Sequence, residues 1–175
     1  MFVGLPCQTA SVLGVFGDRE NLTTVSLICN SVPSQKRWEE YLEKKEKEYG
    51  STCVYVNMRC GMIQMHMTFF NGRTFIDENN EWVQSFVGRN ENIRPSCLKC
   101  EAKYPFIDGD LIVGDSWGID KKAYGFSDNK VGVVLVLSDR GNRKILELED
   151  MTLKELGEDY AKTAQRSNTC LIRHR

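Results

Sequence analysis

Four cysteines in three short segments are the residues of this chain best suited to chemistry. Cys7 follows a proline at the end of an expected strand, and Cys29 ends a second apolar strand. Cys97 and Cys100 form a C-x-x-C pair, whose turn points two thiolates the same way. Four thiolates suit an iron–sulfur cluster or a zinc ion, and the spacing alone does not choose between them.

The other three cysteines fit structural roles. Cys53 and Cys60 flank a strand-like run, and Cys170 lies near the C-terminus. Small apolar residues in strands or in a tail explain these three more simply than a ligand role does. A disulfide framework is disfavoured, because seven cysteines is an odd count and 175 residues need no covalent staples. The first residues also lack the charged and apolar regions of an export signal.

The composition is that of an ordinary globular protein. Hydrophobic residues make up 41% of the chain and charged residues 27%, and 175 residues suffice for one domain with its own core. The formal net charge of -1 shows no basic surplus for nucleic acid. No apolar run approaches the roughly 18 residues of a membrane span. With its thiols expected to be reduced, the protein is predicted to be cytoplasmic, with neither nucleic acid nor membrane as a partner, and its oligomeric state stays open.

The hydrophobic pattern predicts a single α/β domain over 1–175, with a mixed β-sheet, flanking helices and β-hairpins. The periodicity and capping residues predict helices at 8–16, 35–49 and 153–165. Asn71-Gly72 is a hairpin signal, and a second hairpin is expected at Arg140-Gly141, pairing 131–137 with 143–149. Residues 111–113 are expected as a buried strand that leads into a Gly-Asp-Ser-Trp-Gly loop at 114–118.

Taken in order, these segments resemble the C-terminal domain of the coenzyme F420 hydrogenase/dehydrogenase beta-subunit family. The family's G-x-P-C-Q opening corresponds to residues 4–8, and its L-I-C-H-G-V-P-S to 27–34, followed by a helix that starts near Trp38. Its R-x-x-C-x-x-C corresponds to 94–100, and its D-I-x-x-G-D-x-W-G to 110–118. Each motif alone is weak, but four in the same order over nearly the whole chain are fairly specific.

The resemblance implies an iron–sulfur flavoprotein domain that passes electrons between a flavin, iron–sulfur clusters and a redox partner protein or subunit. It implies that a 4Fe–4S cluster is bound by Cys7, Cys29, Cys97 and Cys100. The 114–118 loop then becomes a candidate for binding a planar cofactor such as FAD, through Gly114, Asp115 and Trp117. A tight turn after a buried strand explains the same loop equally well.

Two departures from the family pattern bear on activity. The usual His-Gly after the second cysteine is Asn30-Ser31 here, which alters the hydrogen bonding near the sulfurs and with it the expected potential. The family's N-terminal portion, with ferredoxin-type cysteines and much of the flavin-binding region, has no counterpart in these 175 residues. Whether FAD binds, and whether the chain is itself an enzyme, therefore stay open.

Two other functions fit parts of the pattern. A cytosine methyltransferase also carries its nucleophilic cysteine in a Pro-Cys-Gln segment, but this chain has no glycine-rich cofactor loop after an early strand and no Glu-Asn-Val motif. A non-catalytic zinc-binding or interaction domain accounts for the four cysteines without redox chemistry. The metal content of the purified protein separates this alternative from the iron–sulfur hypothesis.

Overall fold

The chain folds into two compact units in a computed structural model. The structure describes all residues except 61–63, 88, 103–107, 117–118, 128–130 and 158–175. The first unit combines residues 1–30 with 100–175, and the second is the continuous segment 31–99. The second unit is therefore inserted into the sequence of the first.

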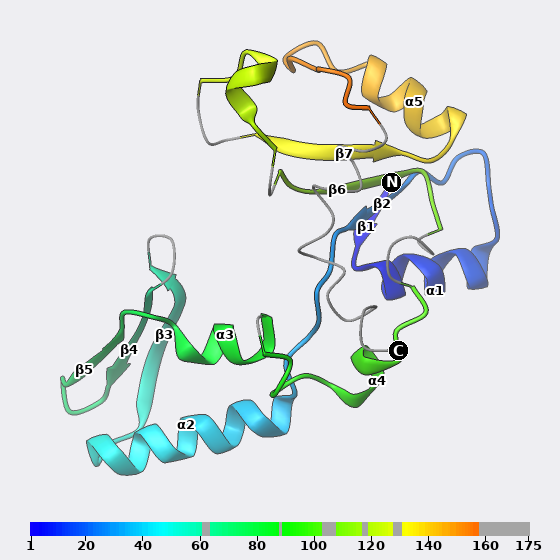
Figure 1. Cartoon of the computed structure of the whole chain (residues 1–175). Coiled ribbons are helices and arrows are strands. Elements are labelled where there is room, and N and C mark those ends of the chain that lie inside the picture. Colours follow the sequence, from blue (N-terminus) through cyan, green and yellow to red (C-terminus); the bar gives the residue numbers. More distant parts are fainter. Residues whose placement is uncertain (61–63, 88, 103–107, 117–118, 128–130, 158–175) are drawn as a thin grey trace. The chain divides into compact units, whose positions relative to one another are not determined.

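The first unit is built around a mixed four-stranded sheet in the order β1-β2-β6-β7 (Figure 1). Its strands are β1 (Phe2–Gly4), β2 (Thr24–Leu27), β6 (Leu111–Asp115) and β7 (Gly132–Val136). The first three run parallel to one another, and β7 pairs antiparallel with β6. The expected strand at 111–113 is thus confirmed, and it lies in the interior of the sheet.

Two helices flank this sheet. α1 (Pro6–Phe16) packs against β1 and β2, and α5 (Asp139–Leu146) lies on the other side of the sheet in Figure 1. Gly141 brings α5 close to the start of β6, because a Cβ at this position would lie only 2.4 Å from the carbonyl oxygen of Asp110. A short 3-10 helix, η1 (Lys121–Tyr124), stands between β6 and β7 in the sequence.

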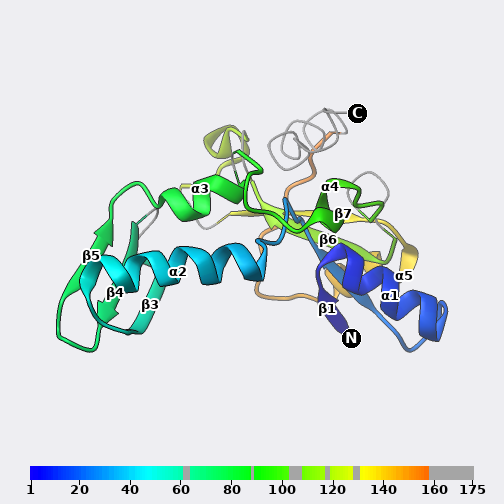
Figure 2. The ribbon, with the colours of Figure 1, turned by 90° about the horizontal axis from the view of Figure 1, so that it is seen from below.

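The second unit is an antiparallel three-stranded sheet with helices. Its elements are α2 (Gln35–Tyr49), β3 (Cys53–Cys60), β4 (Gln64–Phe69), β5 (Thr74–Asp77), α3 (Glu81–Val87) and α4 (Pro95–Leu98). Figure 2 shows α2 running alongside the strands of this sheet, and α2 contacts β3.

The core of the second unit comes from one face of β4. Met65, Met67 and Phe69 alternate along this strand and form a buried core with Trp82 of α3. The ring of Trp38, on α2, lies 5.2 Å from that of Trp82, centroid to centroid. The period of two in β4 therefore directs one face of the sheet onto the aromatic faces of the helices.

Most of the expected elements are confirmed, as is the α/β fold class. The helix predicted at 35–49 spans those residues, and Gly50 ends it with a positive φ of 64°, a conformation that glycine adopts without strain. The helix predicted at 8–16 begins at Pro6 instead of residue 8. The hairpin at Asn71-Gly72 joins β4 to β5.

The second predicted hairpin, at Arg140-Gly141, is wrong. Residues 139–146 form α5, and β7 pairs with β6 instead of with 143–149. Ser138 explains the difference, because its hydroxyl accepts a hydrogen bond from the Gly141 N–H at 3.0 Å and so caps the helix. Of the third predicted helix, residues 153–157 have no regular structure, and 158–165 lie outside the described residues.

None of the helices that the structure describes is long and apolar enough to cross a membrane.

Candidate cofactor-binding site

Cys7 and Cys29 follow the carboxyl ends of two neighbouring parallel strands, β1 and β2, and Asp115 is the last residue of the third, β6. Gly4 of β1 pairs with Ser26 of β2, which pairs in turn with Ile112 of β6. Each of the three candidate residues lies three positions beyond this row. The carboxyl ends of parallel strands are where α/β sheets bind their ligands. The sheet therefore gathers two of the predicted ligands and one predicted cofactor contact along one edge.

Cys7 lies in the first turn of α1, not at the end of a strand. Pro6 begins the helix, a position where its missing N–H costs nothing and its fixed φ is suitable. The side-chain oxygen of Gln8 accepts the Leu5 N–H at 2.8 Å, which fixes the turn between β1 and α1. Ser11 donates a hydrogen bond to the Cys7 carbonyl at 2.8 Å. Cys7 itself is exposed, so its thiol is accessible to a ligand.

Cys29 is half-buried and follows the end of β2 by two residues. The strand pairing continues past β2, since the Ile28 N–H donates to the Val113 carbonyl at 2.9 Å. Next to this contact, Gly114 leaves room for the Ile28 side chain, because a Cβ on Gly114 would lie 2.3 Å from Ile28 Cδ1. Close packing against Ile28 therefore explains the glycine at position 114 without a role in cofactor binding.

The remainder of the 114–118 loop is described only in part. Asp115 is exposed at the end of β6, and the Ser116 hydroxyl donates to the Val131 carbonyl at 2.7 Å. Trp117, the predicted stacking residue, and Gly118 lie outside the described residues. The Ser116 hydrogen bond links the two ends of the connection between β6 and β7.

Cys97 and Cys100 lie on either side of the point where the sequence passes from the second unit to the first. Cys97 is on α4 in the second unit, where its N–H donates to the Arg94 carbonyl at 2.9 Å. Cys100 follows the helix by two residues and belongs to the first unit. Both are half-buried. The C-x-x-C pair therefore lies partly on a single helical turn that Pro95 begins.

No disulfide links any of the described cysteines. These are Cys7, Cys29, Cys53, Cys60, Cys97 and Cys100, and Cys170 lies outside the described residues. Within the part of the chain that the structure describes, no three or more His, Cys, Asp or Glu side chains are grouped so that they could hold a metal ion. Cys53 lies beside the core of the second unit, and burial raises the pKa of its thiol.

Asp110, the first residue of the 110–118 motif, is a buried carboxylate at the opposite end of β6, and its structural role was not predicted from the sequence. Asp110 is 1% exposed, and Oδ2 accepts hydrogen bonds from the Thr24 N–H at 2.8 Å and the Thr24 hydroxyl at 3.2 Å. Oδ1 accepts from the Ser138 hydroxyl and pairs with Arg140 at 2.9 Å. Asp110 thereby ties β2, β6 and the start of α5 together. Its partners lie 86 and 28 residues away in the sequence, so no local signal marks this role.

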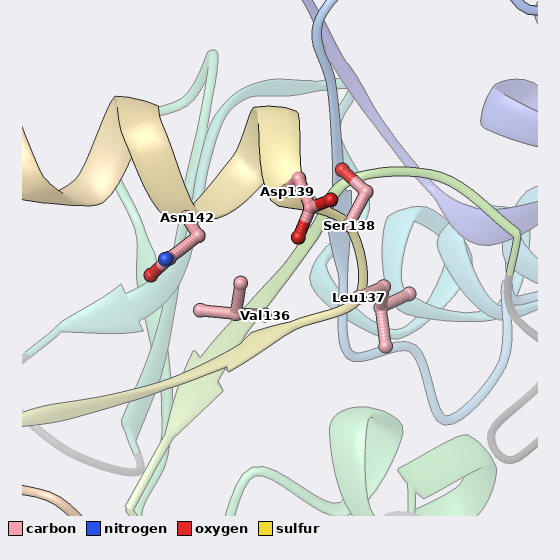
Figure 3. A pocket seen from close by; sticks show the side chains of 5 residues that line it. All are labelled: Val136, Leu137, Ser138, Asp139 and Asn142. Carbon is pink, nitrogen blue, oxygen red and sulfur yellow. The ribbon is translucent and has the colours of Figure 1, made fainter.

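One surface hollow lies close to this carboxylate network. It has a volume of about 470 Å³ and is lined by Val136, Leu137, Ser138, Asp139 and Asn142. Figure 3 shows Val136 on the strand and Asn142 on the first turns of α5, with the hollow between them. None of the predicted site residues lines it.

This fold is an α/β domain with candidate ligands at the carboxyl edge of three parallel strands. The sequence model that describes the C terminus of the coenzyme F420 hydrogenase/dehydrogenase beta subunit matches residues 1–159. The chain belongs to this family, and the resemblance of its motifs is confirmed.

Among solved structures, a chain of the F420-reducing [NiFe] hydrogenase complex from Methanosarcina barkeri is similar, with 16% sequence identity and a TM-score of 0.46. The alignment covers 98% of this chain and 58% of that one, so the present chain spans less than two thirds of the length of the matched hydrogenase chain. No curated protein matches the chain significantly.

Proposed function

We propose that this chain is the iron–sulfur redox domain of a coenzyme F420 hydrogenase/dehydrogenase beta-subunit-like oxidoreductase. The observation that carries the proposal is that Cys7 and Cys29 both follow the carboxyl ends of neighbouring parallel strands, β1 and β2. Family membership over residues 1–159 supports the same assignment.

In this proposal Cys7, Cys29, Cys97 and Cys100 bind a 4Fe–4S cluster. The donor set fits chemically, because four thiols free of disulfides are the usual ligands of such a cluster. When bound, the cluster accepts and donates single electrons. The chain's own residues hold the ligands in place: Pro6 starts the helix that carries Cys7, and the bond from Ile28 to Val113 extends the strand before Cys29. Ligating thiolates must remain reduced, which is consistent with a cytoplasmic location.

FAD binding at Gly114, Asp115 and Trp117 is a separate part of the proposal. Asp115 is exposed at the carboxyl edge of β6, beside the strand that leads to Cys29, where a planar cofactor would lie near the cluster ligands. The chain would exchange electrons with a redox partner protein or subunit.

The test is anaerobic purification and reconstitution of the chain, followed by measurement of iron, acid-labile sulfide and visible absorbance. Broad visible absorbance that is lost in Cys97→Ser and retained in Cys53→Ser supports the cluster. Cys53→Ser is the matched control, since Cys53 is also half-buried and lies beside the core of the second unit. Iron and sulfide at the wild-type level in Cys97→Ser would exclude this cysteine as a ligand and overturn the proposal.

The zinc-binding or interaction domain remains the alternative function, and the half-buried C-x-x-C pair is the observation that favours it. A colourless protein that contains zinc and no sulfide would support this alternative. The flavin part is tested by titration of the chain with FAD, monitored by flavin fluorescence. Asp115→Asn should weaken binding, while Asp108→Asn, a change at another exposed aspartate, should not.

A further inference from the structure

Strand β7 has an open edge whose residues are entirely apolar. It is the outer strand of the four-stranded sheet, and no described strand pairs with its second side. Its residues are Gly132, Val133, Val134, Leu135 and Val136, without a charge or a proline. Natural proteins protect such edges with lysine, proline, bulges or a covering element, because an open edge is a template for another strand. Strand β7 itself has no lysine, no proline and no bulge, so its own residues favour pairing with another strand.

The hydrogen-bond register shows which backbone groups face outward. The Leu137 N–H donates to the Asp110 carbonyl at 2.9 Å, so Leu137 and Asp110 form a hydrogen-bonded pair of the antiparallel ladder. Hydrogen-bonded and non-bonded pairs alternate along an antiparallel ladder, so Leu135 and Val133 also bond to β6. The backbone N–H and C=O groups of Gly132, Val134 and Val136 therefore point away from β6.

The other side of β6 gives an independent check of this register. The Val113 carbonyl accepts the Ile28 N–H, so the backbone of Val113 faces β2. Its antiparallel partner Val134 then makes no ladder bond to β6, as the alternation requires.

We propose that this edge binds the same strand of a second copy of the chain, antiparallel, about a two-fold axis at Val134. Val134 would then lie opposite its own copy, and Gly132 opposite Val136 of the other copy. All three outward-facing residues would form hydrogen-bonded pairs, and the two four-stranded sheets would become one continuous sheet.

The outer edge of β7 is complementary to itself, which favours a second copy of the chain over an unrelated strand as its partner. Val136 is 44% exposed, beside the hollow seen in Figure 3, and the residue that would lie opposite it is a glycine without a side chain. An isologous interface requires this kind of match, in which one surface supplies both the protruding and the receding group. The strand carries no charge, so two copies do not repel each other there.

The test is the mass of the chain in solution, measured under reducing conditions by sedimentation velocity over a wide range of concentrations. We expect a dimer that dissociates on dilution. Val134→Pro should yield a monomer, since proline removes only an outward N–H and leaves the bonds to β6 in place. Circular dichroism verifies that this variant is folded.

A pair of lysine substitutions provides a test that does not depend on proline. Val136→Lys should raise the Kd of the dimer by about tenfold or more, because a lysine on an edge strand opposes pairing. Val3→Lys is the matched control on β1, at the other edge of the sheet, where Val3 is 56% exposed. A monomer at every concentration overturns the proposal. So does a dimer that Val3→Lys disrupts and Val136→Lys leaves intact.

Discussion

Arg140 forms an ion pair with the buried Asp110 at 2.9 Å, and the same guanidinium nitrogen lies 2.7 Å from the exposed Asp18. The side chain of Asp110 is 1% exposed and that of Asp18 is 79% exposed. Both carboxylates therefore share one cation, but Asp110 is buried and also accepts hydrogen bonds from Thr24 and Ser138. The two pairs allow a buried, hydrogen-bonded ion pair to be compared with an exposed one within one protein.

Asp110→Asn should lower the free energy of unfolding by about 3 kcal/mol, since removal of one partner leaves Arg140 without its buried counter-charge. Asp18→Asn is the control and should lower it by less than about 1 kcal/mol, because solvent screens an exposed pair. Urea denaturation of the three proteins gives both values. Equal losses for the two variants would mean that neither burial nor the hydrogen bonds from Thr24 and Ser138 strengthen the Asp110 interaction.

Acid should destabilise the protein through Asp110. Burial raises the pKa of this carboxyl, but hydrogen bonds outweigh burial and leave its pKa below the ordinary 3.8. The bonds come from Ser138, Thr24 and Arg140. Because the folded-state pKa is the lower one, the stabilisation is complete above the unfolded-state value and is lost as the pH falls through the folded-state value. The free energy of unfolding, measured between neutral pH and strong acid, should fall less steeply at the acid end in Asp110→Asn than in the wild type.

Gly114→Ala should destabilise the first unit by about 1 to 3 kcal/mol, because the new Cβ would overlap the Ile28 side chain. Gly14→Ala is the matched control: nothing lies within 4 Å of its added Cβ, and alanine favours a helix. Thermal unfolding gives both shifts. Combining Gly114→Ala with Ile28→Ala should recover part of the loss caused by overlap. If the double variant is destabilised by the full sum of the two single changes, overlap with Ile28 is not the cause.

Trp82→Ala should cost the second unit about 4 kcal/mol, the range found for removing a large aromatic side chain from a core. Trp82 is 4% exposed and contacts the rings of Trp38, Tyr41 and Phe86. Phe70→Ala removes an aromatic ring that is 83% exposed and should change stability by no more than about 0.5 kcal/mol. Denaturation followed by tryptophan fluorescence compares the two variants. Similar midpoints would contradict the core assignment.

The elements that the sequence predicted correctly are those with local signals. The helix α2 begins directly after Ser34, a residue type common at the N-cap, although the Ser34 side chain makes no capping hydrogen bond, and it ends at Gly50. Asn71-Gly72 marks the hairpin between β4 and β5. The signal at Arg140-Gly141 is of the same local kind, but Ser138 satisfies the Gly141 N–H and a helix forms instead. A weak turn signal therefore does not determine the structure where a capping residue and long-range partners both favour a helix.

The candidate site also has one part that the sequence predicts and another that depends on the fold. The type and spacing of the cysteines indicate metal chemistry without any structure. That Cys7 and Cys29 follow neighbouring strands depends on the pairing of β1 with β2, which no residue in either segment reveals. Asp110 was missed because its importance comes from Thr24 and Ser138, which only the folded chain brings to it.

The insertion of residues 31–99 between β2 and β6 has a consequence for synthesis on the ribosome. β2 leaves the ribosome early and pairs with β1, but its other neighbour, β6, begins only at Leu111. By then the whole second unit has been made, and its sheet joins strands that follow one another directly in the chain. The entropy cost of bringing β6 to β2 rises with the length of flexible chain between them. A folded inserted unit leaves less flexible chain than a disordered segment of the same length, so β6 reaches β2 at a lower cost. The order of translation thus favours completion of the inserted unit before the sheet that carries the cysteines.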